Sequence, residues 1–206
     1  MIKLIVFDLM KTLGFRNVSY SITDELKKMS HSKVDRDKFI KIVEKSLELK
    51  KWKSKKAAYK NLCISIGLKP TEKNIKLLMN IKDSADSKIK YYDFTIPLLR
   101  KLKKLGYKVS MLSNNNVFQA EYMKKYSMLK YFDYVLFSCQ IGVLKPHPKI
   151  FKKMLKIARC KPEEMLMIGD SLKDDVIPSK KLGINSIQFK NISQLKKELK
   201  SFCIKI

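Results

Sequence analysis

The 206-residue sequence contains no apolar stretch that approaches the roughly 20 residues needed to span a membrane. Its first eight residues are interrupted by a lysine and end in an aspartate, which is not the pattern of a secretory signal peptide. We therefore expect a cytoplasmic protein. With 45% hydrophobic and 31% charged residues, the composition is that of a folded, soluble chain with one sizeable core.

Cysteine is scarce, and the four cysteines form no motif. Cys63, Cys139, Cys160 and Cys203 lie far apart, with no C-x-x-C pair and no histidine at ligand spacing. Zinc sites and disulfide frameworks normally show such spacing. We therefore expect reduced cysteines that contribute to packing.

Arginine is also scarce, although the formal net charge is +26 at pH 7. The arginines are Arg16, Arg36, Arg100 and Arg159. The remaining positive charge is lysine, spread over most predicted helices and not gathered with aromatic residues. Because residues that bind nucleic-acid phosphates and bases are usually arginines, this distribution favours solvated helix faces over a nucleic-acid interface. A positive field would still attract a small anionic, phosphorylated substrate.

Helices and strands are predicted to alternate over most of the chain. Strands are expected at residues 2–7, 107–112, 132–137, 165–168 and 184–189. Helices are expected at 95–105, with Thr95 as the N-cap, and at 118–126, 148–158 and 176–182. Helix followed by strand is the unit of a parallel sheet. The sequence therefore predicts an α/β fold with a Rossmann-like, doubly wound parallel sheet of about five strands.

Between the first strand and Thr95, only helical patterns occur. Four helices are expected at about 22–29, 36–49, 55–66 and 71–83. We therefore divide the chain into a Rossmann-like core, residues 1–14 and 92–206, and an inserted all-helical cap, residues 15–91. An insertion that begins beside the first strand is well placed to act as a lid. The alternative is that these helices only extend the core.

Acidic side chains follow two of the predicted strands. Asp8 ends the first, and Gly169-Asp170, with Asp175 nearby, follows the strand at 165–168. Ligands of doubly wound sheets bind beyond the carboxyl ends of strands, where Ser113 and Lys145 would also lie. Because carboxylates suit Mg²⁺, the pattern indicates a metal and phosphate site with Asp8 as the candidate nucleophile.

Four motifs, in order, resemble those of the haloacid dehalogenase-like (HAD) hydrolase superfamily. They are Phe7-Asp8-x-x-x-Thr12-Leu13, Ser113-Asn114, Lys145-Pro146, and Gly169-Asp170 with Asp175. The resemblance spans nearly the whole chain. It implies that the helical insertion closes over the active site and that Asp8 forms an aspartyl-phosphate, with Lys145 neutralising developing charge.

The resemblance also implies a ligand set. Asp8 and Asp170 would bind Mg²⁺ directly, the backbone carbonyl of Met10 would supply another oxygen, and Asp175 would hold a metal-bound water. The phosphoryl group would contact four residues: Thr12, Ser113, Asn114 and Lys145.

Met10 departs from the family pattern. Most family phosphatases carry a second aspartate there as general acid and base. We expect a Mg²⁺-dependent hydrolase that acts slowly or on activated small phosphorylated substrates. The alternatives are a 2-haloacid dehalogenase, in which an apolar residue occupies this position, and a catalytically impaired protein that binds phosphate. His147 is the histidine nearest the predicted site, and we interpret it as a surface loop residue.

Overall fold

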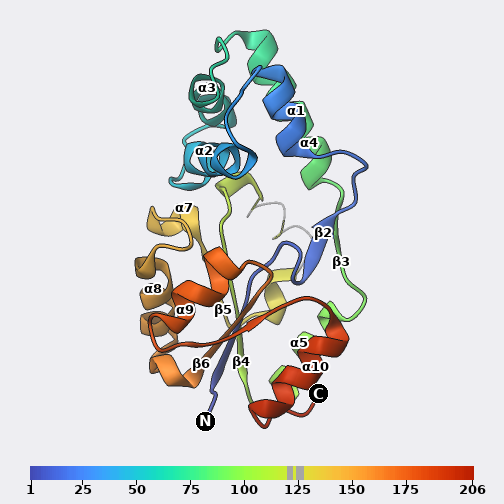
Figure 1. Ribbon diagram of the computed structural model, residues 1–206, viewed down its shortest axis with the longest axis vertical. Coiled ribbons are helices and arrows are strands. Elements are labelled where there is room, and N and C mark those ends of the chain that lie inside the picture. The colour runs from blue at the N-terminus through green and yellow to red at the C-terminus, as the bar shows by residue number, and fades with distance from the viewer. Residues whose placement is uncertain (120–122, 124–127) are drawn as a thin grey trace.

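The computed structural model describes residues 1–119, 123 and 128–206 (Figure 1). One sheet of parallel strands has the order β5-β4-β1-β6-β7. These strands are β1 (Leu4–Phe7), β4 (Lys108–Ser113), β5 (Tyr134–Phe137), β6 (Met165–Gly169) and β7 (Asn185–Gln188). All five predicted strands and their parallel pairing are confirmed. The order places β1 at the centre, between β4 and β6, so that the loops after these three strands are neighbours.

Helices cover both faces of the sheet, as a doubly wound fold requires (Figure 1). Ile5 and Phe7 of β1 pack in one cluster with α5 (Thr95–Lys104) and α10 (Ile192–Ser201). Leu4 and Val6 point to the opposite face and pack with α8 (Pro148–Ala158). This alternation follows from the two-residue period of a strand. Since both faces are buried, β1 is apolar throughout.

The helical unit, α1 to α4, has a hydrophobic core of its own. Its helices are α1 (Ile22–Met29), α2 (Arg36–Glu48), α3 (Lys55–Ser65) and α4 (Glu72–Asp86). Each begins after a side chain that accepts hydrogen bonds from the first turn: Ser21, Asp35, Ser54 and Thr71. The apolar faces meet in a cluster that includes Leu26, Phe39, Leu62 and Leu78. Figure 1 shows the unit beyond the carboxyl ends of the strands, at the end of the molecule opposite the N-terminus.

Two short antiparallel strands join the helical unit to the sheet. They are β2 (Gly14–Arg16) and β3 (Ile89–Tyr91). The prediction that the inserted segment is entirely helical is therefore wrong. A side chain at Gly14 would place its Cβ 2.7 Å from the carbonyl oxygen of Lys90. Residue 14 must therefore be glycine for β3 to pair with β2. Residues 14–16 are too few to show an alternating pattern, which explains why this strand was missed.

Other differences are local. Thr95 is the first residue of α5 and not its N-cap, because its Oγ1 donates to the carbonyl of Leu13 at 2.6 Å. The helix predicted at 176–182 is confirmed as the shorter α9 (Ile177–Lys180), and a π-helical turn that was not predicted, η3 (Leu172–Val176), precedes it. Only residues 117–119 and 123 of the region around the helix predicted at 118–126 are described, and they are helical; the rest lies outside the described residues. Helix α10 was not predicted.

The remaining short elements are α7 (Ser138–Ile141) and the 3₁₀ turns η1 (Met128–Tyr131) and η2 (Pro162–Glu164). All four cysteines are free. Cys63 and Cys139 are buried and pack as predicted, whereas Cys203 is exposed and does not. Within residues 1–119 and 128–206, no helix is both long enough and apolar enough to cross a membrane.

Candidate active site

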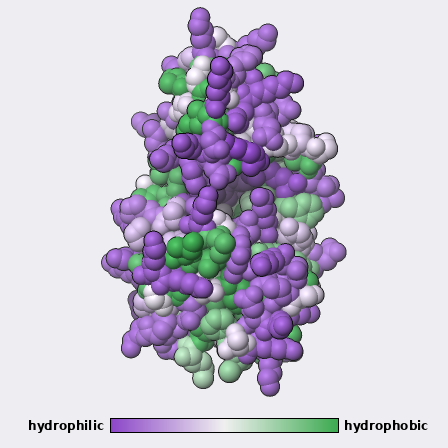
Figure 2. All heavy atoms as spheres, viewed as in Figure 1, coloured by the Kyte–Doolittle hydropathy of each residue, from purple (hydrophilic) through white to green (hydrophobic). Residues whose placement is uncertain are grey.

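A cavity of about 850 Å³ lies between the sheet and the helical unit. Its floor is formed by the loops after β1, β4 and β6, and its roof by residues of α1, α2 and α4. Around it, the face of the molecule shown in Figure 2 is mainly hydrophilic. This position, beyond the carboxyl ends of the central strands, is where doubly wound sheets bind ligands.

Asp8 lies at the end of β1 and is held by a tight turn. Its backbone N–H donates to the carbonyl of Ile168 at 2.9 Å, which continues the pairing with β6. The chain then turns back, because the N–H groups of Leu13 and Gly14 both donate to the carbonyl of Leu9, at 2.9 and 3.1 Å. Asp8 is 7% exposed and faces the cavity. A carboxylate is thus fixed in a sheltered position.

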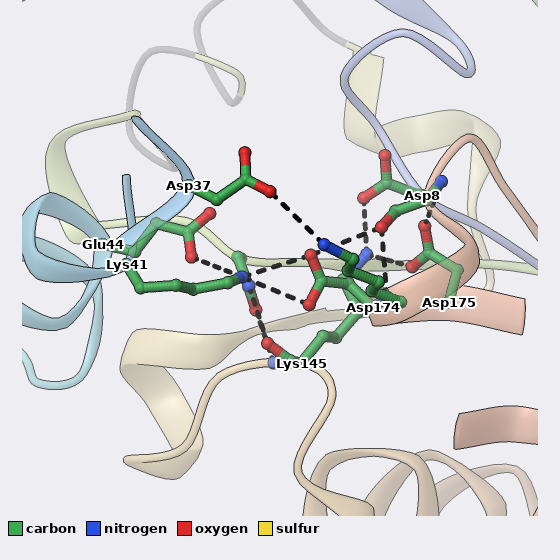
Figure 3. A network of polar contacts seen from close by, with 10 residues as sticks. Asp8, Asp37, Lys41, Glu44, Lys145, Asp174 and Asp175 are labelled. Carbon is green, nitrogen blue, oxygen red and sulfur yellow. Dashed lines mark hydrogen bonds and ion pairs between the residues drawn. The ribbon is translucent and has the colours of Figure 1, made fainter. Parts of the chain in front are cut away.

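Lys145 joins two of the acids (Figure 3). Its Nζ donates to Oδ1 of Asp8 and to Oδ1 of Asp175, each at 2.6 Å. Its backbone is held by the Asn114 side chain, whose Oδ1 accepts from the Lys145 N–H at 2.7 Å and whose Nδ2 donates to the Lys145 carbonyl at 3.2 Å. Asn114 therefore positions this lysine, a function that its sequence position did not reveal.

The loop after β6 supplies the remaining acids. Asp175 is 1% exposed, and its Oδ2 accepts from the backbone N–H of Ser171 at 3.2 Å. A Cβ at Gly169 would lie 2.3 Å from the same Oδ2. Only glycine at 169 leaves room for the Asp175 carboxylate to lie against the backbone there, which explains why these residues occur together in one motif.

Burial and neighbouring charges shift the pKa values of the charged groups in the site. Burial raises the pKa of Asp8, and the ammonium of Lys145 opposes that rise. Burial also raises the pKa of Asp170, and the nearby charge of Asp175 adds to the effect. Although burial disfavours the Lys145 cation, its two carboxylate partners raise its pKa and keep it protonated. Lys11 and Lys145 both oppose the rise in the pKa of Asp170, so two lysines face three acids, and the site favours a further cation.

The acids fit a divalent metal. Asp8, Asp170 and Asp175 each offer a carboxylate oxygen, and these oxygens lie within 4.8 Å of one another. Hard oxygen donors at such spacing suit Mg²⁺, which completes its octahedron with water and substrate oxygens. The structure therefore brings together the three acids that were predicted as ligands.

The other predicted residues divide into two groups. Met10, Ser113, Asn114 and Lys145 line the cavity, and Ser113 ends β4 with 3% exposure. Thr12 does not line it. Its Oγ1 accepts from the backbone N–H of Asp170 at 3.1 Å, so the geometry supports positioning of Asp170 and not the predicted phosphate contact.

His147 is a surface residue, as the sequence analysis favoured. It is the exposed N-cap of α8, and its Nδ1 accepts from the backbone N–H of Lys149 at 3.2 Å. It does not line the cavity. It is therefore not placed to exchange a proton with a ligand of Asp8.

Several charged residues near the site were not predicted. Lys41 of α2 donates to Oδ2 of Asp174 at 3.1 Å and to Glu44 at 2.9 Å (Figure 3). Asp174 is thus balanced by the helical unit and not by the metal site. Glu48 and Lys82 line the roof. Lys82 did leave a signal in the sequence, because it continues the buried stripe of α4 formed by Ile75, Leu78 and Ala85.

Comparison with known proteins identifies related chains. A family model described as haloacid dehalogenase-like hydrolase matches residues 5–189. A glyceraldehyde 3-phosphate phosphatase from Pyrococcus furiosus is 41% identical over 93 residues, which are 45% of this chain and 39% of that protein. The pyrophosphatase PpaX from Bacillus cereus is 35% identical over 95 residues, 46% of this chain and 44% of that protein. The chain thus spans less than half the length of these relatives.

A similar fold occurs among solved structures. A HAD family enzyme from Bacteroides thetaiotaomicron, solved in complex with magnesium and inorganic phosphate, superposes with a TM-score of 0.69. The match has 22% sequence identity and covers 95% of this chain and 99% of the other. At this identity the likeness concerns the fold.

Proposed function

Because the chain belongs to the haloacid dehalogenase-like hydrolase family, we propose that it is a Mg²⁺-dependent phosphatase that acts on a small phosphorylated substrate through Asp8. The observation that carries the proposal is the convergence of Asp8, Asp170 and Asp175 beside Lys145 at one end of the cavity. Relatives named as phosphatases for glyceraldehyde 3-phosphate and pyrophosphate support the same reaction type.

The metal would be held by oxygen ligands. Asp8 and Asp170 would bind Mg²⁺ directly, together with the backbone carbonyl of Met10. Asp175, which already accepts hydrogen bonds from Lys145 and from the Ser171 N–H, would hold a water ligand. When bound, Mg²⁺ supplies the positive charge that screens the Asp8 carboxylate from a negatively charged phosphoryl group.

The reaction has two steps. A carboxylate oxygen of Asp8 attacks phosphorus, and the bond from phosphorus to the leaving oxygen breaks. Ser113 and the neighbouring backbone N–H groups would bind the phosphoryl oxygens, and Lys145 would balance their charge. A water then attacks phosphorus in the aspartyl-phosphate and releases its proton to the solvent, the bond from phosphorus to the Asp8 oxygen breaks, and phosphate leaves. Since the Met10 side chain has no ionisable proton to donate, the leaving oxygen takes a proton from water. This makes the first step slow for alkyl esters.

Hydrolysis of a carbon–halogen bond is the second candidate, and Met10 is the observation that favours it. Halide leaves without a proton, so an apolar residue beside Asp8 is compatible with that chemistry. An excess of acids over lysines is unfavourable for it, because a dehalogenase binds no metal ion to balance the acids. The acidic cluster therefore ranks phosphoryl transfer first.

Two assays on the purified protein separate these functions. Release of 4-nitrophenol from its phosphate ester should require Mg²⁺ and disappear in Asp8→Asn, while 2-chloropropionate should yield no halide. Halide release without Mg²⁺, together with an inert phosphate ester, would establish the second candidate.

Lys145 provides a sharper test of the site. Lys145→Met should lower phosphatase kcat by about 10² or more, because it removes a fixed positive charge beside the transferred group. Lys152→Met removes the same charge from the exposed face of α8 and should change kcat less than twofold. Circular dichroism of both variants checks folding. Equal losses would mean that only the overall positive field matters.

A further inference from the structure

Two buried charged residues of the helical unit line the cavity. Glu48, the last residue of α2, is 8% exposed, and Lys82 of α4 is 5% exposed. Both line the same cavity as Asp8. Among the described residues, neither side chain makes a hydrogen bond or an ion pair. Charged groups this deeply buried are normally paired, so both have unused capacity for a ligand.

The nearby charges are already engaged with one another. Asp86, at the end of α4, accepts from Nε of Arg16 at 2.9 Å and from Nε2 of Gln119 at 3.4 Å. In the part of the chain that the structure describes, the ion pair of Asp86 is with Arg16 and not with Lys82. Of the charges that act on the Glu48 carboxyl, Lys82 is the strongest positive one. We call Glu48 and Lys82 the roof pair.

We propose that the roof pair binds hydroxyl groups on the carbon skeleton of the substrate, which is therefore the phosphate monoester of an uncharged polyol or sugar. The ammonium of Lys82 only donates hydrogen bonds, and an ionised carboxylate of Glu48 only accepts them. A hydroxyl group does both and satisfies either residue. A carboxylate or a second phosphate would attract Lys82 but would be repelled by Glu48.

The dimensions of the cavity agree with this assignment. A volume of about 850 Å³ is far larger than inorganic phosphate requires and lies in the range of sites for whole small molecules. Because the roof pair and Asp8 line the same cavity, a ligand held at Asp8 can extend toward the roof pair. The inference rests on the proposed function, since it assumes that the phosphoryl group lies at Asp8. Sites that bind a substrate hydroxyl discriminate strongly against analogues without it, because their buried polar groups are then left unpaired.

Binding to the Asp8→Asn protein tests the inference without turnover. Two matched pairs of ligands serve as probes: glycerol 3-phosphate with 3-phosphoglycerate, and glucose 6-phosphate with 6-phosphogluconate. Inorganic phosphate is the reference. Calorimetry is performed with Mg²⁺ at pH 8. In at least one pair, the uncharged skeleton should bind more tightly than both its carboxylated partner and inorganic phosphate.

Variants of the roof pair should change this order. Lys82→Met should weaken binding of the preferred polyol phosphate about tenfold more than binding of inorganic phosphate, as the loss of a charged hydrogen bond implies. Glu48→Gln should reduce the difference in affinity between the uncharged and the carboxylated ligand of a matched pair. Lys76→Met, an exposed change on the same helix outside the cavity, should leave all affinities within twofold.

The outcomes separate the two proposals. Preference for the carboxylated member of both pairs, or an equal loss for all ligands in Lys82→Met and Glu48→Gln, overturns the role of the roof pair and leaves the phosphatase proposal intact. Failure of the unmodified protein to bind inorganic phosphate in the presence of Mg²⁺ contradicts the phosphatase proposal, and the inference about the roof pair fails with it. If Lys82→Met does not fold, Glu48→Gln, which keeps the side-chain volume, decides alone.

Discussion

Met10 is the residue that most affects the expected rate. Asp8, Lys145 and the other two acids form one cluster in the cavity. Met10 also lines the cavity, but its thioether cannot exchange a proton as an acid at this position would. General acid and base catalysis contributes about 10² to 10⁴ in rate. The side chain alone accounts for such a loss, because the backbone carbonyl of residue 10 does not depend on it.

Met10→Asp should therefore raise phosphatase activity. On an alkyl phosphate the rate should rise by about 10² to 10⁴, because the new carboxylic acid protonates the leaving oxygen and then deprotonates the attacking water. The rise should be smaller for an aryl phosphate, whose leaving group needs less protonation. Steady-state kinetics on both esters measure the difference. An unchanged phosphatase rate with loss of halide release would mean that Met10 shapes a dehalogenase pocket.

Glu48 should make stability depend on pH. Burial raises its pKa from 4.5 to about 7, with Lys82 opposing the rise, Glu44 and Asp86 adding to it, and Arg16 reducing it. Because the folded-state pKa is raised, Glu48 leaves stability unaffected below pH 4.5 and lowers it as pH rises through 7. At 1.36 kcal/mol per pKa unit, the full effect above pH 8 is about 3 kcal/mol.

Glu48→Gln should thus be more stable than the unmodified protein at pH 8 and equal to it at pH 4.5. Urea unfolding at both pH values measures the difference in free energy. Glu25→Gln, at an exposed position of α1, is the control and should show no such trend. A difference between Glu48→Gln and the unmodified protein that does not vary with pH would show that Glu48 keeps an ordinary pKa in the folded state.

At the scale of elements, α2 and η3 are joined across the cavity. Lys41 of α2 contacts Asp174 of η3, and Lys173 of η3 contacts Asp37 near the start of α2 at 3.3 Å (Figure 3). The first pair is partly buried, whereas both side chains of the second are largely exposed. Because η3 also carries Asp175, these pairs join the helical unit to the acidic loop. The partly buried pair, Lys41 with Asp174, favours the arrangement in which the roof lies over Asp8.

Asp174→Asn should raise KM several-fold, because it weakens the partly buried contact between α2 and η3 and so favours opening of the roof. Stability should change by less than about 1 kcal/mol, as expected for partly exposed ion pairs. Asp37→Asn, which breaks the exposed pair, is the control and should leave KM within twofold. Equal effects of both variants would exclude a specific role for the Lys41 contact.

At the scale of the whole molecule, the acidic cluster links metal binding to stability. Asp8, Asp170 and Asp175 come from two loops that meet only in the folded protein. An ion that binds this cluster should therefore stabilise the folded state and not the unfolded chain. Mg²⁺ at 100 times its Kd should add about 2.7 kcal/mol to the free energy of unfolding.

Mg²⁺ should consequently raise the melting temperature, and Asp170→Ala should abolish that rise. Ca²⁺ and NaCl at the same ionic strength are the controls, since the large positive charge of the chain makes its stability sensitive to salt. Differential scanning fluorimetry is sufficient. A melting temperature that Mg²⁺ leaves unchanged in both proteins would count against the metal site.

The sequence by itself determined the central strands and showed that polar residues lie at their carboxyl ends. The apolar run ending at Phe7 specifies a strand buried on both faces, and the next residue, Asp8, must then lie at its carboxyl end. The same local rule placed Asp170 and Ser113 directly after predicted strands, and the structure has Ser113 as the last residue of β4. These are effects of periodicity and of short-range chain direction, which a sequence records directly.

Apart from Lys145, only the tertiary structure decided which of the many lysines matter. Lys145 lies 137 residues from Asp8 in sequence, and its identification depended on a motif and not on any local property. Lys41 and Lys82 had no motif, and their contacts depend on how α2 and α4 pack over the sheet. A sequence records the charge of a side chain but not its burial or its partner, and these set the electrostatic energy of the site.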